Sequence, residues 1–154
     1  MSEEAVTKAT ISFLKQLNWD VLDYDFPGSG TGRNFHIGSL EDYKNRRRVI
    51  PDIIAYKEGT ILWFENKNKE TLSDYKKIFS LSQERESLLA QITQAYWDKT
   101  IDNLLFAISF SGNSTYLPQA IEYKVNCILQ MLSPLPQSEM TVLFDSQGVF
   151  EVQA

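Results

Sequence analysis

The N-terminal part of the chain changes from a helix-like to a strand-like spacing of apolar residues. Residues 3–17 place apolar side chains on one arc at helical spacing, and Ser2 precedes them as a candidate N-cap. Residues 19–26 alternate between apolar and mainly acidic side chains, as a strand does. The glycine-rich residues 27–33 then predict a loop.

Two apolar segments in the middle of the chain predict an antiparallel hairpin. Residues 49–56 and 60–66 each have the composition of a strand, and the Glu58-Gly59 pair between them suits a two-residue turn. With that turn, Lys57 faces Thr60, and the register of the two strands follows by counting back from this pair. The hairpin is therefore the most closely defined element that the sequence predicts.

The rest of the chain predicts further helices and strands. Residues 82–99 have helical spacing, and residues 104–110 form a continuous apolar run, which is typical of a strand buried on both faces. Residues 119–131 predict another helix, whereas residues 71–77 are mixed. The C-terminal residues 141–152 predict a final hairpin, with strands at 141–144 and 149–152.

This order of elements predicts an α/β fold with a mixed β-sheet flanked by helices, in a single domain over residues 1–154. With 43% hydrophobic and 23% charged residues, the composition is that of a globular protein. No apolar run approaches the roughly 20 residues that span a bilayer, and the acidic N-terminus lacks signal-peptide features. We therefore expect a cytoplasmic protein without a membrane partner. Four residues are expected in the core: Trp19, Trp63, Trp97 and Cys127.

Charge is distributed unevenly along the chain. The formal net charge is −5, yet residues 44–77 carry nine basic and five acidic residues, so that this segment is +4 and the remainder −9. A positive segment in an acidic protein can present a local field to phosphate groups. We expect its basic side chains to contact nucleic acid, the alternative being a solvated loop. The candidates are Arg46, Arg47, Arg48 and Lys69.

The predicted hairpin places Asp52 directly opposite Glu65. Facing residues of an antiparallel pair point to the same side of the sheet, and alternation along the strand brings Lys67 to that side as well. Two facing carboxylates among apolar neighbours repel one another, and a divalent cation such as Mg²⁺ resolves this conflict. The pattern therefore indicates metal-dependent phosphodiester chemistry, with Lys67 stabilising the attacking hydroxide or the charge on phosphorus. The alternative is a charged hairpin end with a solvent-exposed Glu–Lys pair.

The run Pro51-Asp52, a gap of twelve residues and then Glu65-Asn66-Lys67 resembles the PD-(D/E)xK motif of the restriction-endonuclease-like nuclease superfamily. The resemblance extends over most of the chain and implies an αβββαβ core. It implies that Asp52 and Glu65 are catalytic metal ligands and that the backbone carbonyl of Asn66 completes the site. It also implies that Lys67 is the catalytic lysine and that Mg²⁺ is the cofactor, with Mn²⁺ able to substitute.

Many members of that superfamily also place a glutamate of the first helix near the metal. Glu3 lies within the apolar arc of the predicted helix and Glu4 points away from it, so Glu3 is the better candidate for a metal ligand. Relatives also place polar residues near the site from the helix after the motif, where Gln91 lies here. The single histidine, His36, is expected to be a surface or packing residue, with a general base as the alternative.

The expected function is a Mg²⁺-dependent DNA endonuclease of the restriction or defence type. The alternatives are a structure-selective nuclease similar to Holliday-junction resolvases, a hydrolase of a small phosphoester, and a non-catalytic module that binds nucleic acid or protein. One site cuts one strand, so double-strand cleavage would require a homodimer or a partner subunit. The sequence leaves open whether the substrate is DNA or RNA.

Overall fold

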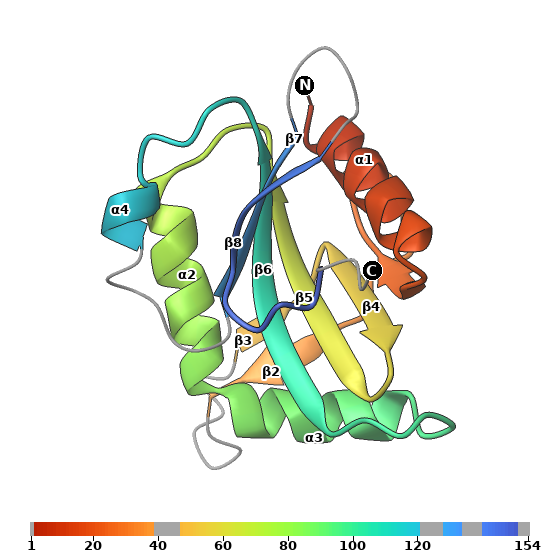
Figure 1. The fold of residues 1–154 in the computed structure, drawn as a ribbon. Coiled ribbons are helices and arrows are strands. Elements are labelled where there is room, and N and C mark those ends of the chain that lie inside the picture. The colour runs from red at the N-terminus through yellow and green to blue at the C-terminus, as the bar shows by residue number, and fades with distance from the viewer. Residues whose placement is uncertain (1, 39–46, 121–127, 134–139, 151–154) are drawn as a thin grey trace.

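A computed structural model describes residues 2–38, 47–120, 128–133 and 140–150. Within these residues, one large mixed sheet is flanked by helices and a separate two-stranded ribbon lies beside it (Figure 1), which confirms the predicted fold class. The helices are α1 (Glu3–Gln16), α2 (Leu72–Gln83), α3 (Arg85–Ala95) and α4 (Leu117–Ala120). The strands are β1 (Asp20–Tyr24), β2 (Phe35–Ile37), β3 (Arg47–Val49), β4 (Ile53–Lys57), β5 (Thr60–Lys67), β6 (Asn103–Ser111), β7 (Ile128–Ser133) and β8 (Thr141–Asp145).

The large sheet has the strand order β1-β4-β5-β6-β7-β8. β5 pairs with β6 and β6 with β7 in parallel, and the remaining neighbours are antiparallel. β2 and β3 pair only with each other and form the separate ribbon. The central position of β6 explains its continuous apolar sequence, because both of its faces are covered.

Two hydrophobic clusters lie on the two faces of the sheet, and β5 contributes to both. Ile61 and Trp63 pack with side chains of α2, α3 and the β2–β3 ribbon. Leu62 and Phe64 pack with Leu14 of α1, on the other face. All four β5 side chains are fully buried, as expected where helices cover a sheet on both sides. The alternation that buries them also decides toward which helix the polar residues at the end of β5 point.

The predicted first helix and the central hairpin are confirmed. The Ser2 hydroxyl accepts a hydrogen bond from the Ala5 backbone N–H at 3.1 Å and so caps α1. Glu58 and Gly59 both have positive φ, 49° and 86°, as a two-residue type I′ turn requires. A side chain at position 59 would also approach the Asp102 carboxylate to 2.9 Å. This turn sets the predicted register, in which Lys57 faces Thr60.

The helix predicted over residues 82–99 is wrong in its bounds. α2 ends at Gln83, and a second helix, α3, begins at Arg85 and ends at Ala95. α2 occupies most of the mixed segment 71–77, and the Thr71 hydroxyl caps it by accepting from the Asp74 N–H at 3.3 Å. Its buried side chains lie on the side of the helix that packs against the sheet. This packing stabilises the helix and is not visible in local helix propensity.

The helix predicted over residues 119–131 is wrong at its C-terminal end, because Ile128–Ser133 is β7, paired in parallel with β6. The first two residues of that predicted helix belong to α4, and residues 121–127 lie outside the described part of the chain. A short apolar segment suits either a strand or a buried helix, and here pairing with β6 decides. In the predicted C-terminal hairpin, the first strand is β8, but it pairs with β7 and is followed by a turn at residues 146–150.

The strand predicted over residues 49–56 is interrupted before Ile53, since Val49 belongs to β3 and the intervening Pro51 lacks the N–H that a ladder needs. Trp19 and Trp63 lie in the core as expected. Trp97 does not: it is 83% exposed just beyond the end of α3. Cys127 lies outside the described residues.

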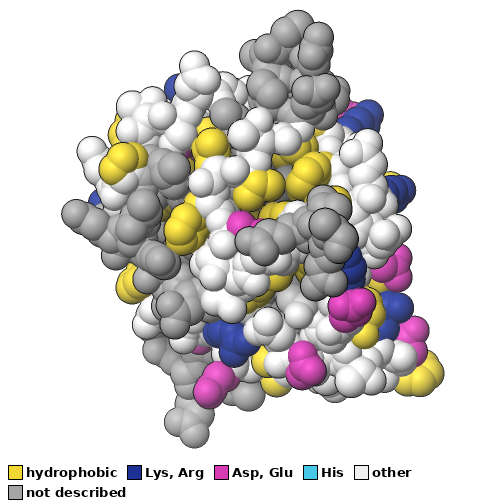
Figure 2. Space-filling view, in the orientation of Figure 1, with side chains coloured by type: hydrophobic (Ala, Val, Ile, Leu, Met, Phe, Trp, Pro, Cys, Tyr) yellow, Lys and Arg dark blue, Asp and Glu magenta, His cyan; other side chains and the backbone are white. Residues whose placement is uncertain are grey.

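The surface of the face shown in Figure 1 is divided by chemistry. Hydrophobic side chains gather over its upper and central parts, where β8 crosses, and charged side chains lie mainly toward the right-hand and lower edges (Figure 2). None of the described helices combines the length and the apolar character that crossing a membrane demands.

Candidate functional site

The site lies where β4 begins and β5 ends, at the end of the hairpin away from its turn. The Asp52 backbone N–H donates to the Phe64 carbonyl at 2.9 Å, although Phe64 is already the partner of Ile53, so the regular antiparallel pairing ends at Ile53 and its register shifts at Asp52. The Asn66 backbone N–H in turn donates to Asp52 Oδ2 at 2.6 Å. Asp52 and Glu65, which counting from the turn places opposite each other, lie just beyond the last regular pair, Ile53 and Phe64, and their side chains interact.

The ionised form of the Asp52 carboxyl group is destabilised by its surroundings. Its burial, followed by the negative charge of Glu65, raises the pKa of Asp52 from 3.8 to about 8, against the opposing effects of the Asn66 N–H and the Lys77 ammonium. A hydrogen bond to Glu65, which only a protonated Asp52 can donate, acts in the same direction as burial. At neutral pH the raised pKa favours a proton on Asp52. A divalent cation in place of that proton would neutralise both carboxylates.

Glu65 is almost enclosed, with its side chain 5% exposed. Its Oε1 accepts from Trp63 Nε1 at 3.4 Å, and its Oε2 lies 3.3 Å from Lys77 Nζ on α2. The sequence indicated Lys77 only as part of the positive segment. Its contact with Glu65 depends on how α2 packs against β5, and no local pattern of residues signals it.

Lys67 lies at the end of β5 and pairs with Glu3 of α1, at 3.6 Å between Nζ and Oε1. Partial burial acts to lower the pKa of Lys67, but nearby carboxylates, Glu3 foremost, outweigh it and raise that pKa, so the side chain remains a cation. Glu4 instead pairs with Lys8 at 3.0 Å in an exposed i,i+4 pair. Of the two helix glutamates, the structure brings Glu3 to the site.

The Asn66 side chain offers a further oxygen. It is 1% exposed and points to the opposite face of the sheet, where its Nδ2 donates to Thr7 Oγ1 of α1 at 3.0 Å. Its Oδ1 is buried and has no hydrogen-bond partner among the described residues. It lines a small cavity of about 220 Å³ together with Glu3, Asp25 and Asp52.

These groups suit a hard divalent cation, which prefers oxygen ligands. The Asp52 and Glu65 carboxyl groups are chemically appropriate donors, whereas the Asn66 side-chain oxygen lies on the face opposite Glu65. No three described His, Cys, Asp or Glu side chains are gathered closely enough to form a metal cage by themselves. Mg²⁺ usually keeps several waters and needs only one or two carboxylates, so this donor set fits that ion.

The predicted nucleic-acid contacts fall in two places. Arg47 and Arg48 lie exposed on β3, and both line a groove beside α2. Lys69 is exposed in the loop after β5. Arg46 lies outside the described residues.

Gln91 belongs to a different part of the molecule from the paired carboxylates. Its Oε1 accepts from the His36 N–H at 2.9 Å, and its Nε2 donates to the His36 carbonyl at 2.8 Å. In this way Gln91 fixes β2 to α3 by bonding its backbone, and the His36 side chain is half-buried beside it. The bonds of Gln91 therefore describe a structural role.

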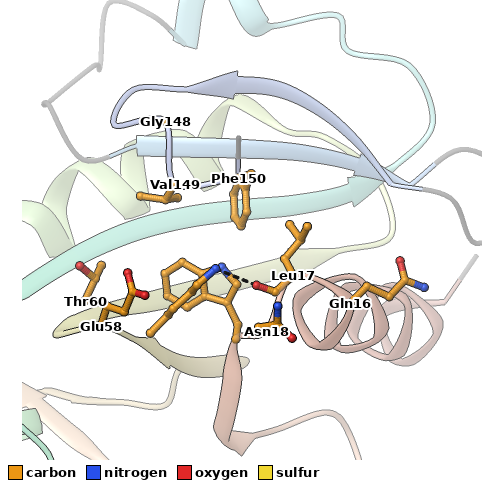
Figure 3. Close-up of a pocket in the computed structure, with 10 residues that line it drawn as sticks. Gln16, Leu17, Asn18, Glu58, Thr60, Gly148, Val149 and Phe150 are labelled. Atoms are coloured by element: carbon orange, nitrogen blue, oxygen red, sulfur yellow. Dashed lines mark hydrogen bonds between the residues drawn. The ribbon is translucent and has the colours of Figure 1, made fainter. Parts of the chain in front are cut away.

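A larger cavity, of about 480 Å³, lies at the turn end of the same hairpin, between the end of α1, Glu58 and residues 148–150 (Figure 3). Its one ammonium group, Lys57 Nζ, donates to the Leu17 carbonyl at 2.9 Å, and Phe150 packs near Trp19. The described residues that line this cavity thus include no pair of carboxylates and no cation without a protein partner, in contrast to the region of Asp52 and Glu65.

Comparisons with known proteins give two structural similarities. No protein-family model matches the sequence, and no curated protein sequence is significantly similar to it. A fdxN element excision controlling factor protein from Anabaena variabilis is similar with a TM-score of 0.47 and 14% identity, over 90% of this chain and 96% of that chain. An XisH family protein from Nostoc punctiforme is similar with a TM-score of 0.41 and 12% identity, over 89% of this chain and 96% of that chain. At this degree of similarity the chain is assigned to no family.

Proposed function

We propose that this chain is a metal-dependent nuclease that hydrolyses phosphodiester bonds in DNA, with Mg²⁺ or Mn²⁺ as cofactor. The observation that carries the proposal is the pair formed by the half-buried Asp52 and the buried Glu65, whose side chains interact at the end of the hairpin and raise the Asp52 pKa. A pair of this kind destabilises the folded state without metal, because two partly desolvated carboxylates repel each other. Strongly perturbed carboxyl groups are characteristic of functional sites.

Each residue of the site has a defined task in this proposal. Asp52 and Glu65 would hold the ion, which, when bound, polarises the phosphate and lowers the pKa of a water molecule. The Lys67 ammonium would donate to negative charge that develops on the phosphate oxygens. Glu3 keeps that ammonium charged and directs it through the ion pair at 3.6 Å.

A plasmid-cutting assay tests the proposal directly. Purified protein is incubated with supercoiled plasmid in Mg²⁺, in Mn²⁺ and in EDTA, beside Lys67→Ala and the control Lys15→Ala, whose exposed lysine is at the far end of α1. We expect cutting only with metal, a loss of at least about 100-fold in Lys67→Ala, and full activity in the control. Equal cutting by Lys67→Ala, or cutting in EDTA, would contradict the assignment. Double-strand cleavage that rises steeply with protein concentration would indicate a homodimer.

The second candidate is a binding module that uses the same fold without catalysis. The basic side chains near the site favour it, because they would serve binding alone as well as catalysis. Thermal unfolding with and without Mn²⁺ separates the two. If the site binds metal, the free energy of unfolding rises by about 2.7 kcal/mol at a metal concentration 100 times Kd, and Asp52→Asn should remove this increase. If the native protein shows no metal-dependent shift and cuts neither plasmid, branched DNA nor RNA, the module is the better description.

A further inference from the structure

A groove runs between β3 and α2, beside the carboxylate pair. Its volume is about 470 Å³, and its polar lining side chains are Arg47, Arg48, Ser73, Lys76, Lys77 and Ser80. All six are exposed. We name this feature the basic groove.

The α2 side of the basic groove is a single helix face. Ser73, Lys76, Lys77 and Ser80 follow one another at intervals of three, one and three residues, which brings them onto one side of the helix. The opposite side of α2 is buried against the sheet, so the helix cannot rotate these side chains away from the groove. The face extends along the helix for about 10 Å, which is the axial length of two to three nucleotides.

The basic groove has one sign of charge. Four of its lining residues are cations, and none of the described residues that line it is acidic. Within the described part of the chain, Arg47, Arg48 and Lys76 form no ion pair with a carboxylate. Cations that pair with no described carboxylate concentrate the field along a groove and attract polyanions, even though the protein as a whole carries a formal charge of −5.

Lys77 connects the basic groove to the candidate site. It lines the groove, and its Nζ lies 3.3 Å from Glu65 Oε2. An anionic chain that follows the groove to this end therefore reaches the carboxylate pair without crossing another acidic surface of the described lining. In the protein without ligand, Lys77 neutralises Glu65, and a phosphate arriving beside it would offer the ammonium an alternative partner.

We propose that the basic groove binds the phosphate backbone of a nucleic acid strand and leads it to Asp52 and Glu65. This inference rests on the proposed function, since it supplies the surface on which the same site would receive its substrate. The described lining contains no aromatic, Asn or Gln side chain that would stack on bases or read adenine edges. The lining cations are side chains that commonly contact phosphates, so we expect binding in the groove to depend little on base sequence.

The proposal is tested by fluorescence anisotropy with two short labelled duplexes of unrelated sequence, in EDTA so that nothing is cut. The test variant combines Arg47→Ala, Arg48→Ala and Lys76→Ala, and a milder variant, Lys76→Gln, guards against misfolding, which circular dichroism checks. Lys15→Ala is the matched control, because its lysine lies on α1 across the sheet from α2. Lys77 is left unchanged because it touches Glu65.

We expect the triple variant to bind both duplexes about 30-fold more weakly at moderate salt, and its slope of log K against log salt to fall by about 2 to 3. Lys76→Gln should lose about 3-fold, and Lys15→Ala should bind like the native protein. Unchanged binding by the triple variant, a loss confined to one sequence, or no binding by the native protein would overturn the proposal. So would polyglutamate binding that the triple variant loses while its DNA binding persists, because an acidic protein would then be the occupant.

The same proteins separate this inference from the proposed nuclease. If the native protein cuts plasmid and the triple variant binds normally, the groove is wrong and the nuclease stands. If the triple variant loses binding while neither it nor the native protein cuts any substrate, the groove stands and the nuclease is wrong. Asp52→Asn should bind DNA at least as tightly as the native protein, because it adds no negative charge and leaves the groove unchanged.

Discussion

Asp52 and Glu70 are two carboxyl groups of neighbouring segments, and the fold treats them in opposite ways. Glu70 accepts hydrogen bonds from the Tyr75 hydroxyl, from Ser114 Oγ at 2.8 Å, and from two backbone N–H groups. These donors outweigh the effect of its burial and lower the pKa of Glu70. Asp52 has one backbone donor and a second carboxylate opposite, and its pKa is raised to about 8.

The difference separates a structural carboxylate from one available for chemistry. Glu70 joins the start of α2 to the loop after β6, and hydrogen-bond donors from both segments stabilise its negative charge. Lys77 offsets the charge of Glu65, but burial and the neighbouring Glu65 still raise the pKa of Asp52. A fold keeps such a pair at a cost to stability, which is the usual relation between a site and the scaffold around it.

The largest effect should be on catalysis, in matched amide variants of the two residues. Asp52→Asn removes a metal ligand in the proposed function, so we expect plasmid cutting to fall by about 1,000-fold or more. Glu70→Gln keeps the site carboxylates and should cut within about 5-fold of the native rate where it remains folded. Initial rates in Mg²⁺ at a temperature below both unfolding transitions measure this. A loss of similar size in both variants would break the distinction between the two carboxylates.

The second effect is on stability, and its sign should be opposite in the same two variants. Glu70→Gln weakens several hydrogen bonds to a charged acceptor and should lower the free energy of unfolding by about 1–3 kcal/mol. Asp52→Asn relieves the repulsion with Glu65 and should raise it when no metal is present. Urea unfolding in EDTA at pH 8 gives both values. If Asp52→Asn proved as destabilising as Glu70→Gln, Asp52 would be structural.

The third effect is a pH dependence with two limbs. The raised Asp52 pKa means that the folded state binds this proton more tightly than the unfolded chain, where the pKa is 3.8. Its stabilisation is complete below that value and is lost as the pH rises through about 8. The lowered Glu70 pKa works the other way, because its stabilisation is present above the ordinary value of 4.5 and is lost as the pH falls below it.

Thermal unfolding in EDTA across the range from about pH 3 to pH 9 should therefore show different limbs in different variants. Asp52→Asn should lose the decline that runs from about pH 4 to about pH 8, a change of several kcal/mol at about 1.4 kcal/mol per pKa unit, and keep the acid limb. Glu70→Gln should show the reverse. An unchanged high-pH limb in Asp52→Asn would mean that another group carries it.

The smallest effect concerns the two glutamates at the start of α1. Glu3→Gln removes the partner of Lys67 and should weaken apparent Mn²⁺ affinity, measured by thermal shift, by about 10-fold. Glu4→Gln disturbs only the exposed pair with Lys8 and serves as the control, with an expected change below about 2-fold. Equal effects of the two variants would show that Glu3 acts through the general charge of the helix terminus.

Local patterns in the sequence determined the geometry of the carboxylate pair. The turn at Glu58 and Gly59 sets a register that ends with Ile53 opposite Phe64, and the next residue of each strand, Asp52 and Glu65, is thereby brought close to the other. This worked because a two-residue turn fixes pairing and alternation fixes sides, both of which are short-range rules. The Ser2 cap and the buried run of β6 were predictable for the same reason.

Packing between distant segments decided the rest. Ile128–Ser133 became a strand because β6 offers an edge to pair with, and α2 formed in a segment without a clear pattern because its buried face fits the sheet. The contact of Lys77 with Glu65 and the donors around Glu70 follow from that docking. The sequence by itself thus determined which carboxylates meet, since that depends on local backbone geometry. Only the tertiary structure decided which cations and donors surround them, because those residues come from elements whose approach is set by the core.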